Sequence, residues 1–331
     1  MKKHNYSAGP CILPQEVFEK SAQAVLNFNN SGLSILEISH RSKDFVAVME
    51  EARALVLELM NLEGKGYQAL FLQGGASLEF LMIPYNLMKI NGKAAYLDTG
   101  TWASGAIKEA KAFGETVVVA TSKDANYNYI PKDYSIPTDA DYFHCTSNNT
   151  IFGTQMKSFP TTNIPMVCDM SSDIFSRSID FSKFDLIYAG AQKNMGAAGV
   201  NMVVVKKEIL GKMARKIPTI MDYQKHIAAG SLMNTPPVFA IYVSLLTLRW
   251  IIEEGGLSEM QNRNTAKSNL LYETIDSLPV FEVRVAKEDR SLMNAVFFLK
   301  DQSLEESFLS LCKAEGMVGV KGYRTVGGVR V

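Results

Sequence analysis

The chain has 331 residues, 47% of them hydrophobic, and its 34 basic residues balance 34 acidic ones. This length allows one large domain and a smaller one, and the apolar content predicts a globular protein with a sizeable core. The balanced charge excludes a global field that would recruit nucleic acid or a membrane surface, so any recognition of an anion must be local.

The N-terminus and the cysteines exclude further classes of protein. No apolar run is long enough for a membrane span, and the two lysines near the N-terminus have no apolar segment behind them, unlike a secretory signal. The cysteines form no CxxC pair and no spacing typical of a metal site. We therefore expect a cytoplasmic protein without a structural metal. The cysteines are Cys11, Cys145, Cys168 and Cys312.

Seven short apolar runs predict strands in the first two thirds of the chain. Amphipathic helical patterns lie between several of them, for example over 77–90 and 103–114. This alternation predicts an α/β fold, with a mostly parallel seven-stranded sheet and helices on both faces. The runs are 67–72, 94–98, 115–120, 141–146, 165–170, 184–190 and 200–206.

The pattern changes after a long helical stretch over 238–256, which ends in two glycines, a typical helix stop. Beyond it we expect a helix over 259–278 and strands over 281–286 and 293–300. The predicted units are a large domain over 14–256 and a smaller α+β C-terminal domain over 257–331, with the N-terminal segment 1–13.

Candidate ligand-binding residues follow the ends of the predicted strands, at the edge where open α/β sheets bind ligands. After the first strand, two glycines open a helix whose backbone amides at Ala76 and Ser77 can hold a phosphate. Asp169 ends one strand, Lys193 lies just beyond the next, and Trp102 follows another. A carboxylate, an amine, an aromatic ring and a helix N-terminus together match the needs of pyridoxal phosphate.

Each of these features alone has an ordinary structural explanation. A glycine pair before a helix is often only a tight turn, and Asp169 at a strand end could cap the next helix. Trp102 could pack in the core, and Lys193 could be a solvated side chain on a turn. The cofactor interpretation is favoured because several strand ends agree with it.

The sequence closely resembles the phosphoserine aminotransferases, a family of fold type I pyridoxal phosphate enzymes. The resemblance extends over essentially the whole chain, and several of its motifs are specific to this family. The motifs are NYSAGPCILP, ISHRSKDF, GGASLEF, DTGTWAS, SNNTIFG, CDMSSDIFSR, YAGAQKN, MNTPP and GYRTVGGVR.

The resemblance implies roles for the residues that surround the cofactor ring. Lys193 would carry the cofactor as a Schiff base, and Asp169 would pair with the pyridine nitrogen. Trp102 would stack on the ring, while Thr150 and Gln192 would donate hydrogen bonds to it.

The resemblance also implies how the cofactor phosphate is held. Ala76 and Ser77 would bind it from the same chain. Asn234 and Thr235 would reach it from the neighbouring subunit, so that a homodimer with shared active sites is expected.

For the substrate, the resemblance implies an anion pocket at the other end of the site. His40, Arg41 and Arg324 would surround the substrate phosphate, and Arg330 would bind the α-carboxylate in a bidentate manner. Tyr323 stands where many members of the family have a histidine before the arginine. It can donate one hydrogen bond but brings no charge.

The end of the sequence departs from the family. The chain stops at Val331, where the family continues with a strand and a final helix, so we expect a small domain that is truncated at its C-terminus. A chain terminus frays unless it is tied down. Arg330 is therefore expected to be poorly held.

The implied reaction converts 3-phosphohydroxypyruvate and L-glutamate to O-phospho-L-serine and 2-oxoglutarate, in L-serine biosynthesis. The family also acts on the phosphorylated hydroxythreonine precursor in pyridoxine synthesis. Two alternatives stay open. One is another fold type I aminotransferase that acts on an unphosphorylated acid, and the other is a protein that binds pyridoxal phosphate without turnover.

Overall fold

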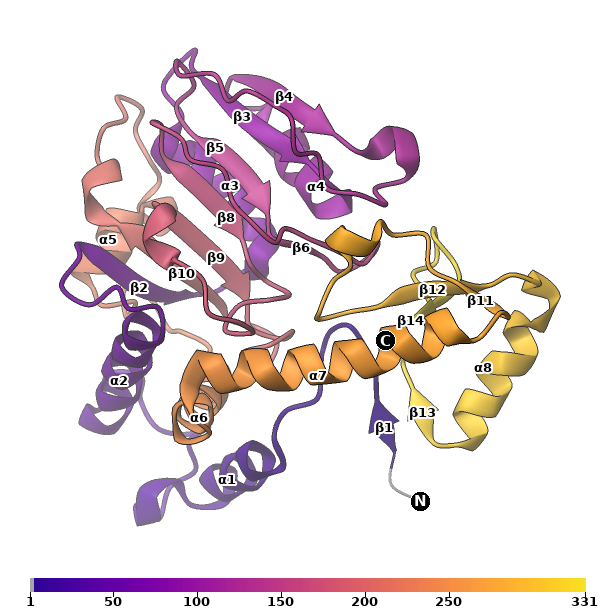
Figure 1. The fold of residues 1–331 in the computed structure, drawn as a ribbon. Coiled ribbons are helices and arrows are strands. Elements are labelled where there is room, and N and C mark those ends of the chain that lie inside the picture. The colour runs from indigo at the N-terminus through magenta and orange to yellow at the C-terminus, as the bar shows by residue number, and fades with distance from the viewer. Residues whose placement is uncertain (1–2) are drawn as a thin grey trace.

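The structure, a computed structural model, describes residues 3–331 (Figure 1). The α-helices are α1 Gln15–Leu26, α2 Lys43–Leu59, α3 Gly75–Leu87, α4 Thr101–Ala110, α5 Tyr223–Ala228, α6 Val238–Glu253, α7 Gly256–Ser277 and α8 Glu305–Ala314. The strands are β1 His4–Asn5, β2 Tyr67–Leu72, β3 Lys93–Asp98, β4 Glu115–Thr121, β5 Phe143–Thr146, β6 Asn148–Asn149, β7 Thr154–Gln155, β8 Met166–Asp169, β9 Leu186–Gly190, β10 Asn201–Lys206, β11 Phe281–Glu282, β12 Val296–Leu299, β13 Met317–Val318 and β14 Val329–Arg330.

A seven-stranded sheet forms the centre of the larger part of the molecule, in the order β2-β10-β9-β8-β5-β3-β4. Each of the seven predicted runs contributes one strand to it. Strand β10 is antiparallel to both its neighbours, and the other pairings are parallel. The prediction of a mostly parallel sheet is therefore confirmed.

Helices cover both faces of this sheet, because successive side chains of a strand point to opposite sides. In β2, Ala69 and Phe71 belong to a core that includes residues of α1, α2 and α6. Leu70 and Leu72 belong to a second core, with residues of α3 and α4. Figure 1 shows α3 and α4 on one side of the sheet and α2 and α6 on the other.

The strand register brings several carboxyl ends to one edge of the sheet. Asn201 of β10 pairs with Leu72 of β2 on one side and with Gly190 of β9 on the other. Asp169 of β8 pairs with Tyr188 of β9 on one side and with Thr146 of β5 on the other. The segments that follow β2, β5, β8 and β9 therefore leave the sheet at the same edge.

The C-terminal part begins with α7, directly after Gly255, whose φ of 104° is favourable for glycine. It contains the antiparallel sheet β11-β12-β14. Strand β1 pairs with β13, which joins the N-terminal segment to this part. The two strands predicted here, over 281–286 and 293–300, are longer than the observed strands β11 and β12. The chain leaves the sheet after β11, and the amide of Ala286 instead donates to the carbonyl of Asn128 at 2.8 Å.

Within residues 3–331, no helix has the length and apolar character needed to span a membrane. The same residues contain no group of three or more His, Cys, Asp or Glu side chains that could hold a metal ion.

Candidate active site

Lys193 lies three residues beyond the carboxyl end of β9, in the turn that leads to β10, and is partly buried. Its Nζ donates a hydrogen bond of 2.8 Å to the hydroxyl of Thr150 and lies 5.6 Å from the centre of the Trp102 ring. Burial lowers the pKa of Lys193, against the opposing attraction of Asp169. A lowered pKa leaves more of the amine neutral, the form that can act as a nucleophile or base.

Asp169 is the last residue of β8 and has only 5% of its surface exposed. Burial raises the pKa of this carboxyl group, and the Lys193 charge lowers it. One carboxylate oxygen accepts a hydrogen bond of 2.9 Å from the amide of Ser171. No helix begins in the turn that follows, so the helix-cap interpretation of Asp169 is wrong.

The segment between β2 and α3 is a tight turn that presents backbone amides at the start of a helix. Gly74 has a φ of 92°, and a Cβ there would lie 2.5 Å from a methyl carbon of Leu78, so the turn requires glycine. No side chain caps α3. The amides of Ala76 and Ser77, in its first turn, have no partner within the helix and carry the positive end of the helix dipole.

Asn234 and Thr235 lie beside this turn in the same chain. The side chain of Gln73 donates a hydrogen bond to the carbonyl of Thr235. Asn234 lines a cavity of about 290 Å³ together with Gln73 and Gly74. The structure thus places both residues next to the start of α3. Their contribution to a neighbouring subunit stays a prediction.

The N-terminal segment packs against Lys193, a feature that the sequence analysis missed. A Cβ on Gly9 would lie 3.1 Å from Cγ of Lys193. The amide of Cys11 donates a hydrogen bond of 2.9 Å to the carbonyl of Gln192. The motif NYSAGPCILP was the signal that could have found this contact, because its glycine and proline fix a close turn.

Arg330 reaches the same site from the C-terminal part. Its Nη1 lies 3.3 Å from the carbonyl oxygen of Thr150 and donates to it. The expectation that Arg330 is poorly held was wrong. It lies in β14, pairs with Val296 of β12, and donates its amide to the carbonyl of Val320 at 2.8 Å.

The remaining predicted substrate residues are not joined to this group by any contact described for residues 3–331. His40 is buried in the turn before α2, and its Nε2 has no partner. Arg41 beside it is exposed, as is Arg324 in the turn before β14. The centre of the Arg330 guanidinium lies 6.0 Å from the centre of the Tyr323 ring. A shared phosphate pocket of His40, Arg41 and Arg324 stays a prediction.

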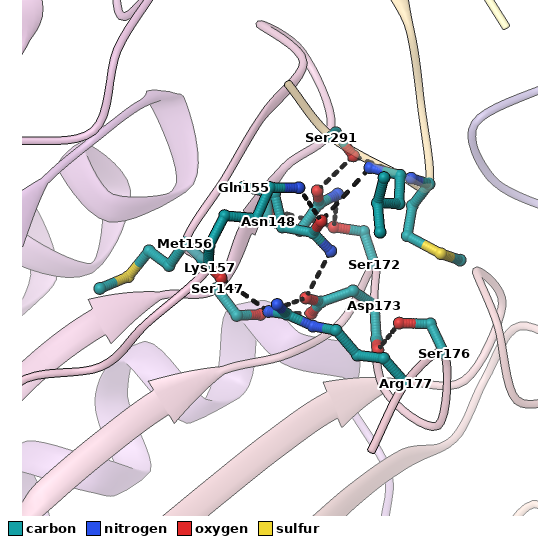
Figure 2. A network of polar contacts seen from close by, with 12 residues as sticks. Ser147, Asn148, Gln155, Met156, Lys157, Ser172, Asp173, Ser176, Arg177 and Ser291 are labelled. Carbon is teal, nitrogen blue, oxygen red and sulfur yellow. Dashed lines mark hydrogen bonds and ion pairs between the residues drawn. The ribbon is translucent and has the colours of Figure 1, made fainter. Parts of the chain in front are cut away.

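A buried polar network that sequence reasoning also missed lies around Asn148 and Asp173 (Figure 2). Asp173 accepts hydrogen bonds from Ser147, from Gln155 at 3.2 Å and from Arg177 at 3.3 Å. Asn148 accepts a hydrogen bond of 2.6 Å from Ser291, which belongs to the C-terminal part. The network therefore connects the edge of the large sheet to the segment before β12.

The Aminotransferase class-V family matches residues 4–322 of the chain. The chain belongs to the class-V aminotransferases. This aminotransferase is 72% identical over 330 residues to the phosphoserine aminotransferase of Flavobacterium psychrophilum, covering 100% of this chain and 93% of that protein. It is 58% identical over 333 residues to the phosphoserine aminotransferase of Phocaeicola vulgatus, with the same coverage of 100% and 93%.

Solved structures agree with this family assignment. The phosphoserine aminotransferase from Bacillus circulans subsp. alkalophilus has a TM-score of 0.96 to this aminotransferase at 44% identity, covering 99% of this chain and 92% of that one. A phosphoserine aminotransferase with bound pyridoxal phosphate, from Trichomonas vaginalis, has a TM-score of 0.94 at 36% identity, with coverage of 99% and 94%. The predicted fold type I architecture is confirmed.

Proposed function

We propose that this class-V aminotransferase converts 3-phosphohydroxypyruvate and L-glutamate to O-phospho-L-serine and 2-oxoglutarate, in L-serine biosynthesis. It is a pyridoxal phosphate-dependent transaminase, like the family to which it belongs. The main support for this proposal is a partly buried lysine, Lys193, at the edge of the large sheet. Its Nζ donates a hydrogen bond to Thr150 and interacts electrostatically with the buried Asp169. The chain is also 72% identical to a phosphoserine aminotransferase.

The residues at this edge fit pyridoxal phosphate. Lys193 offers an amine of lowered pKa, and Asp169 offers a buried carboxyl group that would pair with the pyridine nitrogen. The backbone amides of Ala76 and Ser77 would hold the phosphate, and Trp102 would cover the ring. When bound, the cofactor supplies an electron sink for the charge that is left when a proton leaves the substrate α-carbon.

The chain's own residues would perform the proton transfer and the binding. Lys193 would take the proton from the α-carbon as a general base, because its lowered pKa keeps part of the amine neutral. The Thr150 hydroxyl would orient that amine. Arg330 would bind the α-carboxylate shared by both amino acids, while Arg41 and Arg324 would bind the phosphate or the side-chain carboxylate.

We further propose a cytoplasmic homodimer in which each subunit has a large domain over 14–256 and a small domain over 257–331. The four cysteines are free thiols, which supports a reducing compartment. The glycine pair at the junction of α6 and α7 supports the domain boundary. Asn234 and Thr235 would complete the phosphate site of the neighbouring subunit.

The two half-reactions test the proposed substrates separately. Adding L-glutamate to the purified holoenzyme should abolish the visible absorbance of the bound cofactor, and adding 3-phosphohydroxypyruvate should restore it. If pyruvate or oxaloacetate restores it equally well, the enzyme is an aminotransferase for unphosphorylated acids. If neither L-glutamate nor O-phospho-L-serine changes the spectrum, the protein binds the cofactor without turnover.

A further inference from the structure

Thr150 accepts hydrogen bonds from three groups that come from distant parts of the chain. Its hydroxyl accepts from Nζ of Lys193 at 2.8 Å. Its carbonyl oxygen accepts from Nδ2 of Asn294 at 3.0 Å and from Nη1 of Arg330 at 3.3 Å. A carbonyl oxygen has two lone pairs, so this one is fully used. Thr150 is therefore hydrogen-bonded to both the lysine and the arginine.

The side chain of Asn294 is buried, with 4% of its surface exposed, and its amide has a fixed orientation. Its Oδ1 accepts a hydrogen bond of 2.7 Å from Nδ2 of Asn148. Because Nδ2 can only donate, Oδ1 must face Asn148 and the Asn294 NH₂ must face Thr150. Asn148 is itself held by Ser172 and Ser291, as Figure 2 shows.

Asn294 also belongs to the segment that holds the backbone of Arg330. Ala295 and Val331 exchange two backbone hydrogen bonds, of 2.9 and 3.0 Å. Val296 then pairs with Arg330 in the sheet. The position of the Arg330 backbone and the acceptor for its side chain thus depend on the same short segment.

The guanidinium of Arg330 has capacity left for a ligand. Among the contacts described for residues 3–331, its bond to Thr150 is its one hydrogen bond. Its Nε is buried and has no partner, which is costly unless a ligand satisfies it. The acceptor of this guanidinium, Thr150, lines a cavity of about 560 Å³ together with Asn294 and Lys193, although Arg330 itself does not line it.

We propose that Asn294 is a positioning residue for the substrate carboxylate. It holds the Thr150 carbonyl where Arg330 donates to it, so that the guanidinium stays at a fixed distance from Lys193. The inference rests on the proposed function, in which Arg330 binds the α-carboxylate. Asn294 itself touches neither Arg330 nor Lys193 through any hydrogen bond described for residues 3–331.

The test compares Asn294→Ala with Asn86→Ala in the holoenzyme. Asn86 is the matched control, because it is equally buried and its Nδ2 donates to the carbonyls of Met82 and Met221, in α3 and the segment before α5. For Asn294→Ala we expect KM for glutamate and phosphoserine to rise together by about tenfold, because a displaced Arg330 would lose one charge-assisted hydrogen bond to the substrate carboxylate. We expect little change in kcat and in cofactor affinity. For Asn86→Ala, only the thermal stability should fall.

Binding without turnover gives a second readout. α-Methyl-L-glutamate has no α-proton, so turnover cannot follow and calorimetry measures its association with the holoenzyme. Its Kd should rise about tenfold in Asn294→Ala. It should be unchanged in Asn86→Ala. If Asn294→Ala does not fold, Asn294→Ser replaces it, because the shorter hydroxyl cannot reach the Thr150 carbonyl.

A double-mutant cycle decides whether Asn294 acts through Arg330. In the Arg330→Ala background, removing the Asn294 side chain should raise KM no further. The inference would be overturned if removing the Asn294 side chain raised KM by the same factor in the wild-type and Arg330→Ala backgrounds. It would also be overturned if Asn86→Ala raised KM as much as Asn294→Ala does. Turnover of the wild-type enzyme with glutamate and 3-phosphohydroxypyruvate is measured first. Its absence would count against the proposed function, whereas the calorimetric comparison would still decide the role of Asn294.

Discussion

At the scale of single residues, Lys193 experiences two opposing influences. Burial lowers its pKa, while the nearby carboxyl group of Asp169 raises it, and burial dominates. The same burial raises the pKa of Asp169, which the lysine lowers. Each residue thus needs the other to carry its charge, and both lie where the cofactor would bind. Two substitutions separate their chemical roles from their structural ones.

Lys193→Ala should remove turnover while the fold is retained. Transamination is expected to fall by at least about 10³-fold, because in the proposed function the residue is both the attachment point of the cofactor and the general base. Circular dichroism and thermal denaturation should show an intact protein, since the side chain makes one hydrogen bond, to Thr150. Transamination at the wild-type rate in this variant would contradict the assignment of the active site.

Asp169→Asn should leave cofactor binding nearly unchanged but slow turnover by roughly 10²-fold or more, because a neutral amide cannot stabilise a protonated pyridine nitrogen. The amide oxygen can still accept from Ser171, so the turn should remain. Steady-state kinetics at saturating pyridoxal phosphate measure the effect. Wild-type kcat would mean that Asp169 only shapes the turn.

The sequence predicted Lys193, Asp169 and the α3 turn because each lies at or just beyond the end of an apolar run, and such runs are recognisable locally. It could not predict the role of Asn294. That residue and Thr150 are 144 positions apart, and a buried asparagine in a strand-like stretch has no pattern of its own. For Arg330, the family motif indicated the residue. Its anchoring could not be predicted, because the pairing of β14 with β12 depends on tertiary structure.

At the scale of elements, α3 contains a buried acid that its sequence does not reveal. Glu79 is fully buried, and it accepts hydrogen bonds from Asn201 of β10 at 2.7 Å and from Tyr223 of α5. Burial raises the pKa of Glu79 to about 7, although both hydrogen bonds lower it. In a helix pattern, a glutamate is normally assigned to the solvent face. Here the sheet and α5 bury it.

The raised pKa of Glu79 predicts a dependence of stability on pH. Between its ordinary value of 4.5 and about 7, the folded protein keeps a proton that the unfolded chain loses. The free energy of unfolding should therefore decrease as the pH rises through this window, by on the order of 3 kcal/mol. Glu79→Gln cannot titrate and should lack this decrease. Urea denaturation of both proteins between pH 4.5 and 8 measures the difference, and parallel curves would contradict the prediction.

The sequence predicted the strands of the large sheet but not the antiparallel direction of β10. All seven apolar runs became strands of one sheet, but the runs themselves do not encode direction. The connection from β9 to β10 covers ten residues, 191–200, and contains no helix. A parallel crossover needs a dozen residues or more, so β10 returns antiparallel. Lys193 lies in this connection.

At the scale of the whole molecule, the proposed sharing of active sites between subunits predicts complementation. Mixed Lys193→Ala and Thr235→Ala subunits form heterodimers with one fully native site, since the intact lysine and the intact threonine then meet. With random pairing, we expect about a quarter of wild-type activity per subunit. Activity is measured after subunit exchange has been verified by mass spectrometry of the native dimer.

The structure offers a competing arrangement for the same residues. Thr235 is bonded to Gln73 of its own chain, directly before α3. If Thr235 completes the phosphate site of its own subunit, each site in a heterodimer carries a defect from its own chain. The mixture would then be no more active than its two parents, and site sharing would be excluded.

The packing of Gly9 against Lys193 has a consequence for how the enzyme is made. The neighbours of the lysine come from opposite ends of the chain, with Gly9 near the start and Arg330 acting through Thr150 near the end. Synthesis proceeds from the N-terminus, and the earlier parts can fold while the rest is still on the ribosome. Lys193 can therefore pack against Gly9 before Arg330 has been made. The residue proposed to carry the cofactor would then be in place earlier than the residue proposed to bind the amino-acid carboxylate.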